Sequence, residues 1–327
     1  MHILICNYSP VPVFAYGGTE RVIWDLAKNL VLKGHEVSFL APSNSHCPFA
    51  RILPFNPRQA LQEQIPDDVD LVHFNFNPGP DFDCDKPWFM TQHGNSIPDE
   101  FLPTNTVFVS SNHAQRHGAE CYVHNGLDWQ AYGPVNLLAE RRHHHFLGKA
   151  AWRVKNVQGA IDVAKHADVP LVVMGGTRLN LKRGFRFTWS RKVTFLGMVG
   201  GDIKFDTLQH SKGLIFPVQW HEPFGLAVIE SLYFGCPIFC TPYGALPEIV
   251  SSECGYLSNR LSDLAEAVQA MKFDPVACHQ SAVEYFNAEL MTQRYLQIYE
   301  RIISGEVLNP SPPMMQEPPS RLAWHRH

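Results

Sequence analysis

The segment that decides the fold is His221-Glu222-Pro223-Phe224-Gly225-Leu226-Ala227-Val228-Ile229-Glu230. Proline is tolerated in the first turn of a helix and glycine relaxes the approach to it, so the segment predicts a loop that enters a helix. Glu222 then lies on the loop, and Glu230 lies two helical turns further along. Residues 213–218 are apolar and predict a buried strand just upstream. A helix N-terminus placed in this way favours anions, which suits a phosphorylated ligand with hydroxyls on either side.

The chain around this segment alternates short apolar stretches with stretches of helical periodicity. Strands are predicted at residues 145–148, 171–174, 192–196 and 237–240, and helices at 157–165 and 261–271. A long amphipathic helix is predicted at residues 285–303. Charged, turn-rich residues between 126 and 142 predict a domain boundary there.

The first 41 residues predict a strand, a glycine loop, a helix and a second strand. The strands are residues 2–7 and 36–41, and the helix between them ends at Lys33-Gly34. Such a unit is right-handed and has a parallel sheet. Gly17 and Gly18 could let the backbone approach a phosphate, although the G-x-G-x-x-G pattern of nicotinamide-binding proteins is absent.

Three further strands are predicted at residues 69–74, 88–93 and 106–110, and each ends in polar residues. Ligands of open α/β sheets lie beyond such carboxyl ends. His93, which is followed by Gly94, is therefore well placed for a site.

Composition excludes several classes of protein. The net charge is -4 and no Lys/Arg-rich arm is present, which argues against nucleic acid as the partner. The eight cysteines lack C-x-x-C spacing and several lie in apolar runs, which indicates reduced thiols in a cytosolic protein. The sequence opens on a strand rather than on a signal peptide, and no apolar run reaches the roughly 18 residues of a spanning helix. We expect a cytoplasmic protein that at most associates peripherally with the inner face of a membrane.

Several motifs together resemble one family. They are Glu222-x-Phe-Gly-Leu-x-x-x-Glu230, Gly235-Cys-Pro-Ile238, Gly244-x-x-Pro-Glu248-Ile-Val250, the Gly17-Gly18-x-Glu20 loop, Gly34-His-Glu-Val37, Thr91-x-His93-Gly94 and Asn125-Gly126-x-Asp128. This ordered set resembles the retaining glycosyltransferases of family 4, the glycosyl transferases of group 1, and covers nearly the whole chain to residue 303.

The resemblance implies the α/β fold called GT-B, in which two Rossmann-like domains face each other across a cleft. Residues 1–130 would form the acceptor-side domain, and residues 131–285 the domain that binds the nucleotide sugar. Residues 286–303 would be a helix that braces the first domain. Residues 304–327 are a Pro-rich tail that we expect to be flexible.

The resemblance also assigns donor-site residues. Glu222 would engage hydroxyls of the donor sugar, and Phe224, Gly225 and Leu226 would shape its pocket and offer amides to the phosphate. Glu230 would accept from both ribose hydroxyls, because the two oxygens of a carboxylate accept side by side.

The basic residues of the implied site are Lys149 and Lys155, which would neutralise the diphosphate. Lys149 stands where the family usually has Arg, so the bidentate fork of a guanidinium is lost there. His93 would contact the transferred sugar, and Met198 would touch the base through its backbone. The implied catalytic residues are thus Glu222, His93 and Lys155.

The implied reaction moves a sugar from a UDP- or GDP-hexose to a hydroxyl of a glycan or lipid-linked acceptor, with retention, in envelope glycan or glycolipid synthesis. The leaving phosphate assists deprotonation of the acceptor, so no enzymic nucleophile is needed. A glycosidase with paired carboxylates fits less well, because the spacing puts Glu222 and Glu230 at different parts of one ligand. Two alternatives stay open: a GT-B sugar-nucleotide epimerase, and a non-catalytic relic that binds nucleotide sugar or glycan.

We expect no metal and no cofactor besides the nucleotide sugar. Asp81-Phe82-Asp83 has the D-x-D pattern of the other large glycosyltransferase fold, but it lies between prolines in an apparent surface loop. The three histidines at 143–145 suggest a metal, yet neighbours in a strand point to opposite faces and cannot all bind one ion.

A basic run interleaved with aromatic residues lies in the second half of the chain. Its members are Arg178, Lys182, Arg183, Phe185, Arg186, Phe187, Trp189, Arg191 and Lys192. Such a run could meet anionic lipid or a charged glycan. The alternative is a solvated helix whose aromatic side chains pack inward.

Overall fold

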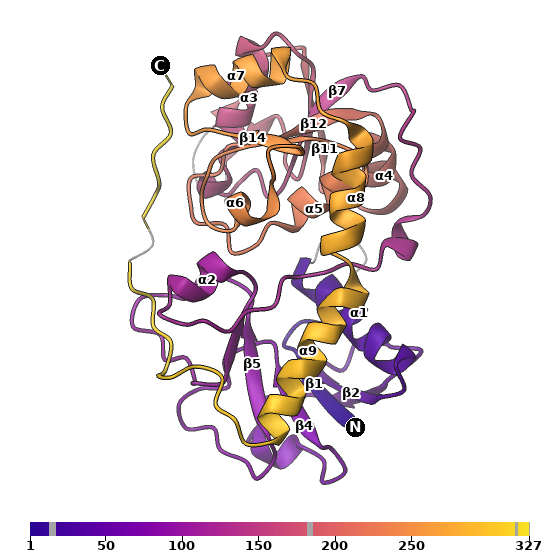
Figure 1. Ribbon diagram of the computed structural model, residues 1–327, viewed down its shortest axis with the longest axis vertical. Helices are drawn as coiled ribbons and strands as arrows, with labels where there is room; N and C mark the ends of the chain where they lie inside the picture. Colours follow the sequence, from indigo (N-terminus) through magenta and orange to yellow (C-terminus); the bar gives the residue numbers. More distant parts are fainter. Residues whose placement is uncertain (13–17, 182–185, 318–319, 327) are drawn as a thin grey trace. The chain divides into compact units, whose positions relative to one another are not determined.

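A computed structural model describes residues 1–12, 18–181, 186–317 and 320–326. The described residues divide into two compact units (Figure 1). The first unit contains the chain up to Asp128 and the segment that begins at Phe286 and ends before Ser320. The second unit contains Trp129 to Tyr285 and the residues from Ser320 on.

The first unit is built on a parallel sheet of six strands within the described residues, in the order β3-β2-β1-β4-β5-β6. The strands are β1 (His2–Cys6), β2 (Glu36–Ala41), β3 (Arg51–Pro54), β4 (Leu71–Phe74), β5 (Trp88–Gln92) and β6 (Thr106–Phe108). The central strands β1 and β4 are buried along their whole length, as their mostly apolar sequences predict. The order reverses between β1 and β4, so the carboxyl ends of these two strands flank a switch point.

Helices cover this sheet, and α9 is fastened to it by buried polar contacts. The helices are α1 (Gly18–Leu32), the 3-10 turn η1 (Gln62–Gln64), α2 (Ser111–Gln115) and α9 (Ala288–Ile303). In β4, His73 Nδ1 lies 3.0 Å from the hydroxyl of Tyr299 in α9, and His73 Nε2 lies 2.8 Å from Thr91 Oγ1 in β5. The hydroxyl of Tyr295 lies 3.0 Å from the same Thr91 oxygen. These contacts fix the position of α9 along the sheet, because each buried polar group needs its partner.

The second unit repeats the topology of the first. Within the described residues its parallel sheet has the order β11-β8-β7-β12-β13-β14, which again reverses between the first strand in sequence and the fourth. The strands are β7 (His143–Leu147), β8 (Leu171–Met174), β11 (Val193–Gly197), β12 (Ser211–Phe216), β13 (Ile238–Cys240) and β14 (Gly255–Leu257). The carboxyl ends of β7 and β12 therefore flank the switch point of this unit.

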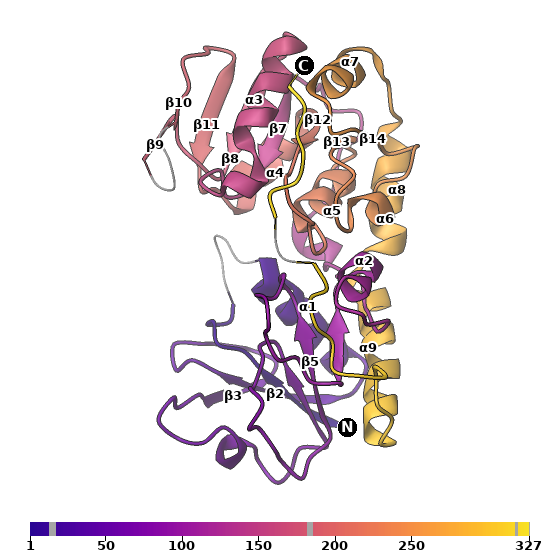
Figure 2. The same cartoon turned by 90° about the vertical axis from the view of Figure 1, so that its left-hand side faces the viewer.

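The elements that connect these strands are mostly helices. They are η2 (Trp129–Tyr132), η3 (Arg153–Lys155), α3 (Val157–His166), α4 (Gly201–Gln209), α5 (Leu226–Tyr233), α6 (Leu246–Ile249), α7 (Leu261–Ala270) and α8 (Pro275–Tyr285). A separate antiparallel pair, β9 (Leu179–Asn180) and β10 (Arg186–Phe187), lies beside β11 (Figure 2).

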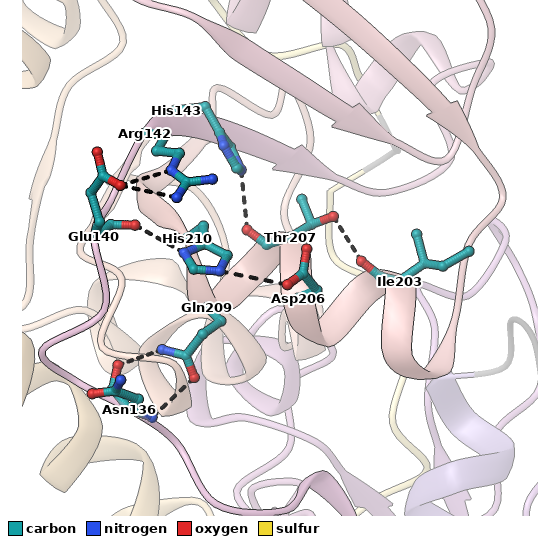
Figure 3. Close-up of polar contacts among 9 residues, drawn as sticks. All are labelled: Asn136, Glu140, Arg142, His143, Ile203, Asp206, Thr207, Gln209 and His210. Atoms are coloured by element: carbon teal, nitrogen blue, oxygen red, sulfur yellow. Dashed lines mark hydrogen bonds and ion pairs between the residues drawn. The ribbon is translucent and has the colours of Figure 1, made fainter.

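Helix α4 is held against the segment that leads into β7 (Figure 3). The amide of Gln209 bonds to the backbone of Asn136 in both directions, at 3.0 and 2.5 Å. His210 Nδ1 lies 2.9 Å from the carbonyl oxygen of Glu140, and His143 Nε2 lies 3.1 Å from that of Thr207. Most of these bonds reach backbone atoms, so they fix the helix itself as well as its side chains.

Some predicted elements were placed wrongly. The predicted helix at 285–303 is α9, which begins three residues later at Ala288, because Asn287 is extended and caps α9 by accepting from Leu290 N through its side chain. Strands β3 and β14 and helix α4 were not predicted, since each is short or weakly patterned. The run from Arg178 to Lys192 contains the β9–β10 pair rather than a helix, with Phe187 and Trp189 exposed.

The Pro-rich tail was predicted to be flexible, but its described residues are bound to the protein. Asn309 is 1% exposed, and its amide nitrogen donates to the carbonyl oxygens of Thr104 and Thr106 at 2.8 Å. Further on, Leu322 N donates to the carbonyl oxygen of Gln219 at 2.9 Å. The Pro-rich composition correctly predicts that the described residues of the tail form no helix or strand. It does not predict these contacts, because an extended segment can bind through its backbone and one amide side chain.

None of the described helices is both long enough and apolar enough to cross a membrane. All eight cysteines are free thiols, and six of them are buried.

Candidate active site

The centre of the candidate site is an ion pair between Lys155 and Glu222. Lys155 Nζ lies 2.9 Å from Glu222 Oε1 and 2.7 Å from Oε2. The indole nitrogen of Trp220 donates to Oε2 at 2.7 Å, and the ammonium group lies 4.8 Å from the centroid of the same indole. The side chains of Lys155 and Glu222 are 13% and 7% exposed. The pair is thus largely withdrawn from water, where charge-assisted hydrogen bonds are strong.

Two loops place this pair at the switch point of the second unit. Lys155 follows β7 and ends η3, and Glu222 follows β12. The backbone nitrogen of Gln219 donates to the carbonyl oxygen of Val154 at 2.7 Å, which joins the two loops directly. Asn156 adds a second link, because its side chain donates to the carbonyl oxygen of Pro217 at 2.8 Å while it caps α3.

The turn that leads from Glu222 into α5 follows the predicted geometry. Gly225 caps the helix with φ of 112°, in the left-handed region that favours glycine. Phe224 is 3% exposed and packs inward, whereas Leu226 is partly buried at the first position of α5. The amides at this helix start remain candidates for a phosphate.

Glu230 lies in α5 with its carboxylate buried. Lys204 Nζ, from α4, and the hydroxyl of Tyr132, from η2, both lie 2.5 Å from Glu230 Oε1. The side chains of Lys204 and Glu230 are 7% and 4% exposed. Glu230 Oε1 therefore accepts hydrogen bonds from both Lys204 and Tyr132. The prediction that Glu230 contacts ribose did not include these two partners.

Lys149 and Met198 follow two strands of the same sheet. Lys149 follows β7 and is partly buried, with its ammonium group 5.2 Å from the centroid of Trp152. Its backbone neighbours are fixed, because Gly148 N donates to the carbonyl oxygen of Met174 and Ala150 N to that of Gly175, each at 3.0 Å. Met198 follows β11 and is 49% exposed.

A cavity of about 540 Å³ lies beside the ion pair. Its lining is Trp152, Arg153, Val154 and Trp220, and the two indoles meet edge to face with centroids 6.0 Å apart. Aromatic faces of this kind suit the apolar face of a sugar ring or a base.

Comparison with known proteins indicates the class of enzyme. Residues 136–272 match the family model of glycosyl transferases group 1. Residues 136–272 thus form a glycosyl transferases group 1 domain, and the chain is a glycosyltransferase. It is 21% identical to an O-antigen chain mannosyltransferase C of Escherichia coli, over 89% of this chain and 96% of the relative.

The solved structures that this glycosyltransferase resembles show that its fold is GT-B. A glycosyltransferase involved in avilamycin A biosynthesis, AviGT4, superposes with a TM-score of 0.73 at 21% identity, over 93% of this chain and 98% of that one. Sucrose-phosphate synthase of Thermosynechococcus elongatus gives 0.69 at 19% identity, over 93% and 100%.

In the first unit of the glycosyltransferase, His93 follows β5. Its Nε2 lies 2.8 Å from Oδ1 of Asn75, which follows the neighbouring strand β4. Burial lowers the pKa of His93 to about 4, so the imidazole is neutral at physiological pH. It can therefore bond a sugar hydroxyl but does not supply a positive charge. Gly17 lies outside the described residues, and Gly18 begins α1.

The two sequence patterns that suggested a metal have other surroundings in the glycosyltransferase. Asp81 and Asp83 are exposed, and Phe82 between them packs edge to face on Phe74 and Trp88. Neighbouring histidines of β7 contact different groups: His143 contacts the Thr207 carbonyl, whereas His145 lies between the hydroxyls of Ser211 and Ser231. Among the described residues, no group of three or more His, Cys, Asp or Glu side chains could hold a metal ion.

Sequence reasoning missed three residues that contact the predicted carboxylates: Trp220, Lys204 and Tyr132. Trp220 could have been found, since it lies two residues before Glu222 and its indole has a donor to offer. Lys204 and Tyr132 carry no such signal, because they are 26 and 98 residues away from Glu230 in the sequence.

Proposed function

We propose that this glycosyltransferase transfers a hexosyl group from a UDP- or GDP-sugar to a hydroxyl of a glycan or lipid-linked acceptor, with retention at the anomeric carbon. The observation that supports this most directly is the Lys155–Glu222 pair with Trp220, at the switch point of the second unit. The proposal places the protein in family 4 and in the synthesis of an envelope polysaccharide such as lipopolysaccharide. It places the protein in the cytoplasm, in peripheral contact with the inner face of the membrane.

The two charges of the pair have separate roles in the proposal. Glu222 accepts hydrogen bonds from hydroxyls of the donor sugar, in an orientation held by the indole of Trp220. Lys155, with Lys149 as a second cation, offsets the charge that grows on the diphosphate as it leaves. At about 4 Å and an effective dielectric constant near 20, one such attraction is on the order of 4 kcal/mol before desolvation. The existing ion pair holds both side chains in place before the donor arrives.

The reaction needs no nucleophile from the protein. The bond between the anomeric carbon and the diphosphate oxygen breaks, and the acceptor oxygen bonds to the same carbon on the same face. The acceptor proton passes to the leaving diphosphate, so charges and protons balance. Neutral His93 serves as a hydrogen-bond partner of the transferred sugar, and no metal is required.

The relatives guide the choice of donor. The Escherichia coli relative is described as an O-antigen chain mannosyltransferase, so mannosyl donors come first. One structural neighbour, HepE of Anabaena, was solved with UDP and glucose, so UDP-sugars come second.

The first test is thermal unfolding of the protein with UDP, GDP, ADP and their common sugars, each with magnesium and with a chelator. A ligand at a hundred times its dissociation constant stabilises the fold by about 2.7 kcal/mol. We expect one nucleotide family to raise the melting temperature equally in both conditions. A shift that requires magnesium would contradict metal independence, and the lack of any shift would favour the non-catalytic relic.

The second test is transfer to polysaccharide and lipid-linked acceptors by the Glu222→Gln variant. Glutamine keeps the size of the side chain but removes its charge, so we expect kcat/KM to fall at least about 100-fold. The variant should stay folded with a lowered melting temperature, because Lys155 loses its charged partner. Glu266→Gln is the matched control, because Glu266 is exposed on α7. Full activity of the Glu222 variant would refute its role. Donor consumption without an acceptor, with an isomeric nucleotide sugar as product, would indicate the epimerase.

A further inference from the structure

The exposed apolar side chains of the protein are mostly isolated, but four of them lie within eleven residues of the second unit. Leu179 is 47% exposed, Leu181 71%, Phe187 38% and Trp189 83%. Single exposed apolar residues are normal on protein surfaces, whereas a contiguous group of them indicates an interaction site.

Three of these side chains, Leu179, Phe187 and Trp189, form one cluster on the β9–β10 hairpin. Leu179 in β9 pairs directly with Phe187 in β10, so the two side chains lie side by side. Leu181 and Trp189 each lie two residues after these paired positions, beyond the ends of β9 and β10 and towards opposite ends of the antiparallel pair. The rings of Phe187 and Trp189 meet edge to face, 4.6 Å between centroids.

The opposite side of the hairpin is fixed to the sheet of the second unit through Arg178. Its guanidinium donates to the carbonyl oxygens of Thr188 at 2.6 Å and Ser190 at 3.0 Å, and to that of Val193 in β11 at 2.6 Å. Thr188, between the two exposed aromatic residues, is buried. The hairpin therefore presents its apolar face outward from a fixed base.

The sequence of this segment carries only positive charges, one of which, that of Lys192, is paired with the Asp168 carboxylate at 2.6 Å. No Asp or Glu occurs from residue 169 to residue 201, whereas six cations do: Arg178, Lys182, Arg183, Arg186, Arg191 and Lys192. Arg191 and Lys192, just beyond Trp189, are exposed. An exposed tryptophan beside aliphatic and basic residues fits the interface of an anionic bilayer, where indoles settle at the headgroups and cations attract the surface.

We propose that this hairpin face, which consists of Leu179, Phe187 and Trp189 with the flanking Arg191 and Lys192, is a membrane-docking surface for anionic phospholipid. The inference rests on the proposed function only for the choice of an anionic leaflet. Vesicle binding needs neither donor nor acceptor, so its outcome and that of the nucleotide test are read separately.

The experiment is co-sedimentation of the full chain with vesicles of phosphatidylcholine alone, and with vesicles that contain phosphatidylglycerol at a ratio of roughly 3:1. We expect binding to the anionic vesicles that weakens strongly at about 0.5 M salt, where surface charges are screened. Binding to neither kind of vesicle would overturn the proposal.

Variants locate the surface. Arg191→Glu changes the local charge by two, and at about fivefold per charge we expect a loss of roughly 25-fold in partitioning. The double variant Phe187→Ser with Trp189→Ser removes the apolar contact, and we expect a loss of at least about tenfold. The controls are Lys272→Glu for charge and Leu138→Ser for an exposed apolar residue, Leu138 being 95% exposed in the same unit. The two hairpin variants and the two control variants should all keep the increase in melting temperature that nucleotide binding causes.

Two results would contradict this assignment. One is vesicle binding that the hairpin variants leave unchanged, which would place the lipid contact elsewhere. The other is binding of dextran sulfate by the hairpin in the absence of any vesicle binding, which would make the face a site for an anionic polysaccharide.

Discussion

At the scale of single residues, the two glutamates of one motif have different surroundings. Glu222 accepts from Lys155 and an indole beside an open cavity, whereas Glu230 is buried against Lys204 and Tyr132. The first arrangement suits direct contact with a ligand. The second arrangement indicates that Glu230 Oε1, which contacts Lys204 and Tyr132, has a structural role.

The Trp220→Phe variant tests the indole as a positioning residue. Phenylalanine keeps an aromatic ring near Lys155 but removes the donor to Glu222 Oε2. We expect kcat to fall about tenfold with little change in donor KM, because a small misplacement of a reacting group is costly. Steady-state kinetics measure this. Trp152→Phe, which keeps the aromatic wall of the cavity and the bond to Glu222, should retain nearly full activity; an equal loss in both variants would indicate a purely structural role.

Replacement of Lys204 by Met tests the buried pair. The variant leaves Glu230 charged and buried, so we expect a loss of about 3 to 5 kcal/mol in unfolding free energy, measured in urea. Adding Glu230→Gln removes that charge and keeps an acceptor for Tyr132, so most of the loss should be recovered. The control is Lys192→Met, which breaks an exposed pair with Asp168 and should cost less than about 1 kcal/mol. Equal losses in the two single variants would contradict this account.

At the scale of elements, the site depends on loops that meet at the carboxyl ends of strands. Gly244, between β13 and α6, forms an isolated bridge with Glu222, and Ala245 N donates to the Glu222 carbonyl oxygen at 2.9 Å. A third loop thus supports the backbone that carries the catalytic candidate.

The Gly244→Ala variant tests this support. Gly244 has φ of 67°, and a Cβ there would lie 2.3 Å from the backbone nitrogen and oxygen of Glu222, so the loop must move. We expect transfer activity to fall at least about 100-fold. Gly201→Ala is the control, because Gly201 has φ of 52° but open space around the added Cβ, and it should cost only the backbone strain of roughly 1 kcal/mol. Similar activity in both variants would refute the role of the contact.

At the scale of the whole molecule, both units bury histidines in their sheets. Burial lowers the pKa of His73 and of His145 well below the ordinary value, and lowers that of His144 to about 4. The unfolded chain binds these protons near pH 6.5, whereas the folded chain does not. Stability is therefore complete above that pH and is lost as the pH falls. Asp25, whose pKa burial raises to about 6, has the opposite but smaller effect.

We expect the unfolding free energy to fall steeply between pH 6.5 and pH 4. A shift such as that of His144 corresponds to a loss on the order of 3 kcal/mol across this range. Urea unfolding at several pH values measures the slope, which His144→Leu should flatten. The exposed His166→Leu is the control and should leave the slope unchanged. Constant stability over the range would contradict the proposed cause.

Much of the fold could be predicted because its signals are local. Strand β1 and the second half of β12 are short apolar runs, and Gly225 marks the start of α5 by its need for a positive φ. What could not be predicted was weakly patterned or distant. Strand β3 has no buried residue, and the tail is held by Asn309, whose partners lie about 200 residues earlier.

The sequence by itself determined the alternation of strands and helices, the strand, loop and helix around Glu222, and the set of polar residues after the strands. Each follows from periodicity and from the restrictions on Pro and Gly, which act over a few residues. Only the tertiary structure decided that Lys155 contacts Glu222, that Lys204 contacts Glu230, and that the basic run is a hairpin with an outward apolar face. Those outcomes depend on which distant groups share a buried space, and burial decides which charges must be paired.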